Sequence, residues 1–103
     1  MVSPADNAVT LLNNALLGIR LDKACVTRGP SGEIALWLAR EDSDALARIL
    51  SLDPAMFSMN LRSIGVQPLG GSITATATML YFTNEGAERL AARILDHLGS
   101  SSQ

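Results

Sequence analysis

The sequence predicts an α+β fold, a two-layer sandwich in which three helices cover one face of an antiparallel four-stranded sheet. The chain has 103 residues, a length that fits one domain. Apolar residues recur with helical spacing near both ends, and short apolar segments separated by turn signals lie between them. The predicted element order is α-β-β-α-β-β-α. We expect a single α+β domain over residues 1–99 and a disordered C-terminal tail over residues 100–103.

The first helix is predicted over residues 3–19. Ser3 is a suitable N-cap, and Pro4 suits the first helical position. The helix has one apolar stripe, made by Ala5, Ala8, Val9, Leu12, Leu16 and Ile19. The opposite face carries amide and hydroxyl groups where a solvated helix usually has Lys and Glu, namely Asn7, Thr10, Asn13 and Asn14. Such a face suits a hydrated protein interface, although plain exposure to solvent explains it more simply.

A hairpin is predicted next, with strands over residues 20–28 and 33–39. The sequence Gly-Pro-Ser-Gly at residues 29–32 is a turn signal between them. Cys25 falls in the middle of the first strand, where a cysteine is usually a small buried hydrophobic residue. The second strand contains the longest unbroken apolar run, residues 34–39, which is far shorter than a membrane span.

The second helix is predicted to begin in an acidic segment. Glu41, Asp42 and Asp44 surround Ser43, and this pattern indicates an N-cap with favourable charge at the positive helix end. The helix is expected to run to about Leu52. Asp53-Pro54 should then stop it, because the residue before a proline avoids the helical conformation.

A second hairpin is predicted from strands over residues 57–66 and 72–82, joined by a turn at residues 68–71. The segment 72–82 alternates clearly in residue type, as a strand does. One of its faces, expected to lie under the helices, consists of Ile73, Ala75, Ala77, Met79 and Tyr81. The other face begins with Thr74, Thr76 and Thr78 and should be solvated at that end.

The last helix is predicted to open near Thr83 or Asn84 and to run to Leu98, with Gly99 as its C-terminal cap. Glu85 and Arg89 have the i, i+4 spacing of a helical ion pair. If all helices cover one face of the sheet, the other face must be solvated or paired with a second copy.

The composition disfavours binding to nucleic acid or to a membrane surface. Charged residues make up only 17% of the chain, and the net charge is −2. The basic residues are scattered and do not form the stripe that phosphate binding requires. A single cysteine cannot form an internal disulfide, which is typical of a reducing compartment. We therefore predict a cytoplasmic protein.

The residues that could support catalysis are few and far apart. One Cys and one His are too few for a zinc site, and Cys25 and His97 are 72 positions apart. His97 lies in the last turn of a predicted helix, where a cation is favourable. The acidic cluster at residues 41–44 is explained by the start of a helix. We therefore predict no catalytic residues, no metal and no cofactor.

The function that fits these observations is a non-catalytic interaction module, an adaptor or chaperone-like protein that acts as a homodimer. Its partners would be a second copy of itself and another protein. Low charge and a sheet face that needs cover favour this interpretation. The candidate contact residues are the amide face of the first helix and a flexible apolar segment that contains Met56, Phe57 and Met59.

Two alternatives remain open. In the first, the chain is a regulatory domain that binds an anionic small molecule, and its candidate anchors are Trp37, Arg40, Arg62 and Tyr81. In the second, it is an inhibitor or immunity-type subunit of a larger partner. The acidic cluster at residues 41–44 would then imitate an anionic substrate.

Overall fold

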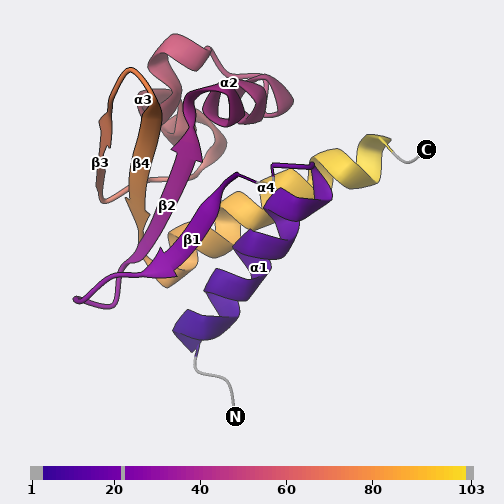
Figure 1. Cartoon of the computed structure of the whole chain (residues 1–103). Coiled ribbons are helices and arrows are strands. Elements are labelled where there is room, and N and C mark those ends of the chain that lie inside the picture. The colour runs from indigo at the N-terminus through magenta and orange to yellow at the C-terminus, as the bar shows by residue number, and fades with distance from the viewer. Residues whose placement is uncertain (1–3, 22, 102–103) are drawn as a thin grey trace.

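A computed structural model describes residues 4–21 and 23–101 (Figure 1). It confirms the α+β fold, the element order and the packing of the helices against an antiparallel four-stranded sheet. The helices are α1 (Pro4–Gly18), α2 (Arg40–Ile49), α3 (Phe57–Asn60) and α4 (Asn84–Ser101), and two 3-10 turns, η1 (Pro54–Met56) and η2 (Leu61–Ile64), flank α3. The strands are β1 (Cys25–Arg28), β2 (Ile34–Ala39), β3 (Gly70–Ile73) and β4 (Ala77–Phe82).

The strands lie in the order β1-β2-β4-β3, so that β2 and β4 are central and β1 and β3 are the edges. The sequence alone does not determine this order, because two hairpins can be placed in a sheet in more than one way. All neighbours are antiparallel, and Leu36 of β2 lies opposite Leu80 of β4. Since directly opposed residues share a face, this register decides which side chains point toward the helices.

The core fills the space between the helices and one face of the sheet, the inner face. It contains Leu12 and Leu16 of α1 and Leu90 and Ile94 of α4, which run side by side in Figure 1. The sheet contributes alternate residues of its two central strands, namely Ile34, Leu36, Leu38, Leu80 and Phe82. Burial of this much apolar surface is the main force that holds the helices on the sheet.

The predicted faces of the last strand are reversed in the structure. Thr78, Leu80 and Phe82 are buried on the inner face, whereas Met79 and Tyr81 point outward and are half-buried. The large side chains of Leu80 and Phe82 fill the core better than the alanines that the prediction had placed there. The hydroxyl of Thr78 is accommodated by a hydrogen bond to Ser43.

The strand predicted over residues 57–66 is wrong. This segment forms η1, α3 and η2, three consecutive helical turns. Phe57 and Leu61 are buried, and Ile64 packs against the core, at spacings of four and three residues. That spacing places all three on one side of a helix. Gly65 then ends the turns with a left-handed φ of 81°.

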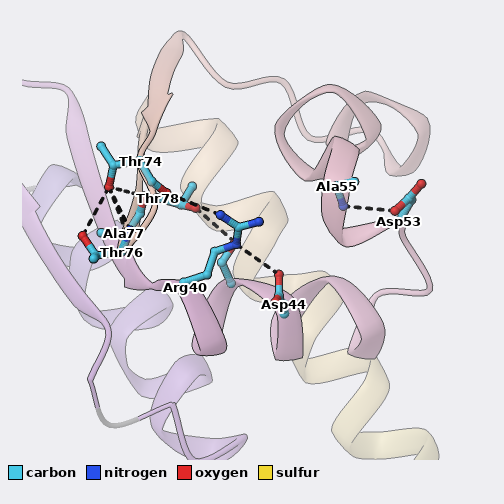
Figure 2. Close-up of polar contacts among 9 residues, drawn as sticks. Arg40, Asp44, Asp53, Ala55, Thr74, Thr76, Ala77 and Thr78 are labelled. Atoms are coloured by element: carbon cyan, nitrogen blue, oxygen red, sulfur yellow. Dashed lines mark hydrogen bonds and ion pairs between the residues drawn. The ribbon is translucent and has the colours of Figure 1, made fainter.

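The continuous strand predicted over residues 72–82 is instead a hairpin, because β3 and β4 are separated at residues 74–76. Thr74 forms this turn through its hydroxyl, which accepts hydrogen bonds from the backbone N–H groups of Thr76 and Ala77 at 3.3 and 3.1 Å. Figure 2 shows these contacts. Gly70 and Gly71, predicted as part of a turn, belong to β3.

The second helix begins earlier than predicted. Ser43 is not its N-cap, because α2 starts at Arg40 and the hydroxyl of Ser43 is buried on the inner side. The helix ends at Ile49, before Asp53-Pro54, and Ser51 adopts a left-handed φ of 60°. Asp53 caps η1 instead, since its carboxylate accepts a hydrogen bond from the backbone N–H of Ala55 at 3.0 Å (Figure 2).

The two ends of the fold agree largely with prediction. Helix α1 covers the predicted segment, whereas the predicted N-cap, Ser3, lies outside the described residues. Thr83 accepts a hydrogen bond from the backbone N–H of Gly86, and Arg89 pairs with Glu85 at 2.6 Å as the spacing indicated. The helix α4 continues through Gly99 to Ser101, so Gly99 does not end it. None of the described helices has the length and apolar character needed to cross a membrane.

Candidate interaction surfaces

The outer face of the sheet is uncharged. By the strand register it is formed by Cys25 and Thr27 of β1, Ala35, Trp37 and Ala39 of β2, Ala77, Met79 and Tyr81 of β4, and Gly70 and Ser72 of β3. The described helices contribute their buried side chains to the core on the inner side. Trp37, at the centre of the outer face, remains 37% exposed and lies directly opposite both Cys25 and Met79.

A second surface is a groove beside the edge strand β3. Its volume is about 470 Å³, and its apolar lining includes Met59, Leu69, Ile73 and Leu80. Met59, Leu69 and Ile73 are 64%, 61% and 52% exposed, which is high for large apolar side chains. Arg62 is the charged residue among those that line the groove, and it also borders a neighbouring, more polar hollow.

The candidate contact residues of the flexible apolar segment divide into two kinds. Met59 lines the groove, and Met56 is 44% exposed on η1. Phe57, by contrast, is only 1% exposed and belongs to the core. Phe57 is therefore a packing residue under these turns and cannot be a surface contact.

The candidate residues of α1 are all exposed, as the amide-rich face predicted: Asn7, Thr10, Asn13 and Asn14. Leu11 and Leu17 are exposed on the same helix. Helix α1 packs beside β1 and α4, whereas the groove adjoins β3 at the opposite edge of the sheet. The two predicted sets of contact residues therefore do not form one continuous patch.

The four predicted ligand anchors are not assembled into one pocket. Trp37 and Tyr81 share the outer face, and Arg62 borders the groove on the other side of β3. Arg40 is bound locally, since its guanidinium donates to the backbone carbonyl of Thr74 at 3.5 Å and pairs with Asp44 at 3.8 Å (Figure 2). This contact ties the start of α2 to the turn between β3 and β4.

Two of the three carboxylates in the acidic cluster, those of Glu41 and Asp44, have partners within the fold. Glu41 accepts a hydrogen bond from Lys23 at 2.6 Å, and this bond, together with the positive charge of Lys23, lowers the pKa of Glu41 below its ordinary value of 4.5. Asp44 pairs with Arg40, and one carboxylate oxygen of Asp42 is buried. The charges of Glu41 and Asp44 are therefore each partly balanced by a basic side chain of the same chain.

The structure places Cys25 and His97 on different elements, β1 and α4. Cys25 is exposed on the outer face, and His97 belongs to α4, which packs on the inner side. Cys25 is thus not the buried residue that its place in a strand suggested. Within residues 4–21 and 23–101, no group of His, Cys, Asp and Glu side chains is arranged to hold a metal ion.

Sequence reasoning missed Leu69, Ile73 and the two glycines of β3 as parts of a surface. The signal was the Gly-Gly pair at residues 70–71, flanked by the large apolar residues Leu69 and Ile73. Two glycines can lie in a strand, where the absence of side chains lets another backbone approach closely, as well as in a turn. No protein-family model matches this chain, and neither does any curated protein or solved structure at a significant level.

Proposed function

We propose that the protein is a non-catalytic interaction module, an adaptor or chaperone-like protein that acts as a homodimer. The observation that carries this proposal is the outer face of the sheet, which lacks charged side chains and exposes Trp37 at its centre. Tryptophan is among the residues most enriched at the energetic centres of protein interfaces. A second copy of the same face is the occupant that we propose.

The physical argument begins with the cost of leaving this face in water. Trp37, Met79 and Tyr81 present apolar area beside one another, and burial of such area stabilises a complex by about 25 cal/mol per Å². Two sheets that pack face to face interdigitate their side chains at a separation of about 10 Å. A two-fold arrangement places the same uncharged surface on both sides, so no charge is buried without a partner.

The size of the face sets the expected strength of the dimer. Strands about 4.8 Å apart and six residues long present a flat face of roughly 15 by 20 Å. This is well below the ~800 Å² that each partner contributes to a standard interface. We therefore expect a weak dimer that dissociates reversibly on dilution.

The test is sedimentation velocity of the full chain over a range of concentrations. Trp37→Lys places two like charges at the centre of the proposed interface and should leave a monomer at concentrations where the wild type is dimeric. Leu17→Lys is the matched control, because Leu17 is also an exposed apolar residue but lies on α1. Circular dichroism spectra of both variants check that the chain is folded.

Two results would contradict the proposal. A wild-type chain that remains monomeric up to millimolar concentration would exclude the homodimer. A dimer that persists in Trp37→Lys but is lost in Asn13→Arg would move the interface from the sheet to the amide-rich face of α1. Trp37→Lys thus tests the outer face of the sheet, and Asn13→Arg tests the amide-rich face of α1.

A further inference from the structure

We propose that the groove beside β3 binds an extended segment of a partner protein, which adds a strand to the sheet edge and places a carboxylate on Arg62. The inference rests on the proposed function, because it names the class of partner that the interaction module would hold. It concerns a different surface from the dimer face. The two proposals can therefore fail separately.

The backbone of β3 is available for pairing on one side. The sheet order places β3 at an edge, with β4 as its single neighbour. Thr74 donates its backbone N–H to the carbonyl of Ala77, which sets the bonded positions of the ladder from the turn end, whereas the Leu69 N–H, which bonds to the carbonyl of Tyr81, makes the ladder irregular just before Gly70. By the alternation of that ladder, Gly71 and Ile73 direct their N–H and C=O groups away from β4. An added strand would find donors and acceptors there at regular spacing.

The edge lacks most of the features that usually prevent such pairing. Protected edge strands carry Lys, Pro, inward charges or a covering loop. Strand β3 has the sequence Gly-Gly-Ser-Ile, without charge or proline. A Cβ atom at Gly70 would meet nothing within 4 Å, so the surface beside this residue is open. Short length is the protective feature that remains.

The groove supplies apolar contacts for the side chains of an added strand. Met59 of α3 and Leu69 and Ile73 beside the edge line it, and Leu80 belongs to the core strand next to β3. Alternate side chains of an extended segment point to the same face, so every second residue would enter the groove. The groove of about 470 Å³ lies within the 300–1,000 Å³ range typical of ligand sites.

The positive charge of Arg62 beside the groove indicates what kind of segment would bind there. Arg62 is exposed, and within the described part of the chain its side chain takes part in no ion pair. A carboxylate in the partner would bind its guanidinium in a bidentate geometry. A second copy of the same edge is a poor occupant, because residues lining the groove include an arginine but no acidic side chain. Two paired copies would bring like charges together.

The test begins with a displayed library of random decapeptides selected on the full-length chain. We expect enriched peptides that alternate apolar residues and carry Asp or Glu at one fixed position. The best synthetic decapeptide is then measured by fluorescence polarisation. Its binding should slow amide hydrogen exchange at Gly71 and Ile73, because their N–H groups gain partners.

Two variants and two matched controls locate the site. Ile73→Glu and Arg62→Glu should each weaken decapeptide binding by about tenfold or more. Leu17→Glu and Arg48→Glu are the controls, since both residues are exposed and lie on other elements, α1 and α2. They should leave the affinity within about twofold. Selection repeated on Arg62→Glu should replace the acidic position with Lys or Arg, a change that a merely structural role of Arg62 would not produce.

Three outcomes would overturn the inference: no peptide is enriched, the selected peptides bind Ile73→Glu as well as wild type, or they share no acidic position. The subunit mass is measured on the same samples. A dimer that binds no peptide leaves the homodimer intact and removes the groove as a site. A monomer that binds the decapeptide through Arg62 supports the groove and contradicts the homodimer.

Discussion

The hydroxyl of Thr78 donates a hydrogen bond to the hydroxyl of Ser43 over 3.3 Å, and these side chains are only 2% and 3% exposed. The bond joins the central strand β4 to helix α2, through two residues that are 35 positions apart in the chain. Removal of one hydroxyl leaves the other buried without its partner, which costs about 1–3 kcal/mol. Ser43→Ala and Thr78→Val should each lower the free energy of unfolding by about that amount.

The double variant separates the hydrogen bond from simple changes of packing. Ser43→Ala/Thr78→Val removes both polar groups together, so its loss should be smaller than the sum of the two single losses. Urea unfolding of the wild type and the three variants measures this difference. Losses that add fully would mean that the two hydroxyls are not coupled.

Gly70 and Gly71 of β3 are neighbours in the same strand, but a side chain at each would meet different surroundings. A Cβ atom at Gly71 would stand 2.5 Å from the backbone oxygen of Met79 and 2.9 Å from a methyl carbon of Leu80. Backbone atoms cannot move aside cheaply, so Gly71→Ala should destabilise the fold by about 1–3 kcal/mol. A Cβ at Gly70 meets nothing within 4 Å, and Gly70→Ala should change stability by less than about 1 kcal/mol. Thermal unfolding of the two variants compares them directly, and equal melting temperatures would contradict the tight approach of β3 to β4.

The ion pair between Lys23 and Glu41 should make a small part of the stability of the fold depend on pH. The hydrogen bond from Lys23, followed by its charge, lowers the pKa of Glu41 in the folded chain. The stabilisation from this pair is therefore present above the ordinary pKa of 4.5 and is lost as the pH falls through the lowered value. Both side chains are largely exposed, so the effect on total stability should be small.

An NMR titration of the Glu41 carboxyl carbon checks this prediction. Lys23→Gln should raise the pKa of Glu41 toward 4.5, since both the charge and the ammonium donor are lost. Lys23→Arg keeps a positive charge and a donor, and it should retain most of the shift. The same pKa in all three chains would mean that Lys23 does not hold Glu41 in solution.

The fold class was predictable because it follows from the number and order of helices and strands, and most of these elements have signals within their own segments. The apolar stripe of α1, the turn at residues 29–32 and the spacing of Glu85 and Arg89 all have local causes, and the structure agrees with them. The hairpin at residues 70–82 was missed because Thr74 makes the turn with its own hydroxyl. Threonine favours strands, so the residue type concealed the turn.

The helical turns around Phe57 and the orientation of β4 were predicted wrongly for a different reason. Spacings of four and three residues at Phe57, Leu61 and Ile64 compete with a strand pattern over the same short segment, and only the core decides between them. Likewise, alternation identifies two faces of β4 but not which one is inside. Residue type alone made Met59 and Arg62 candidate site residues. That they line the same groove as Ile73 depends on the tertiary fold, which the sequence pattern does not show.

The single cysteine of the chain can report on the proposed dimer face. Cys25 is exposed on the outer face directly opposite Trp37, so packing of a second copy on that face would shield its thiol. Modification by a thiol reagent would then proceed through the monomer. At a subunit concentration tenfold above the dissociation constant, about one fifth of the subunits are monomeric, and the reaction should be about fivefold slower than in dilute solution.

The rate of thiol modification in Trp37→Lys is the control for this experiment. This variant keeps Cys25 but should not dimerise, so its thiol should react at one rate at every protein concentration. Leu17→Lys should behave like the wild type, because Leu17 lies on α1, away from the outer face. A wild-type rate that is independent of concentration, in a sample shown by sedimentation to be dimeric, would place the interface elsewhere, since only a contact on the sheet covers Cys25.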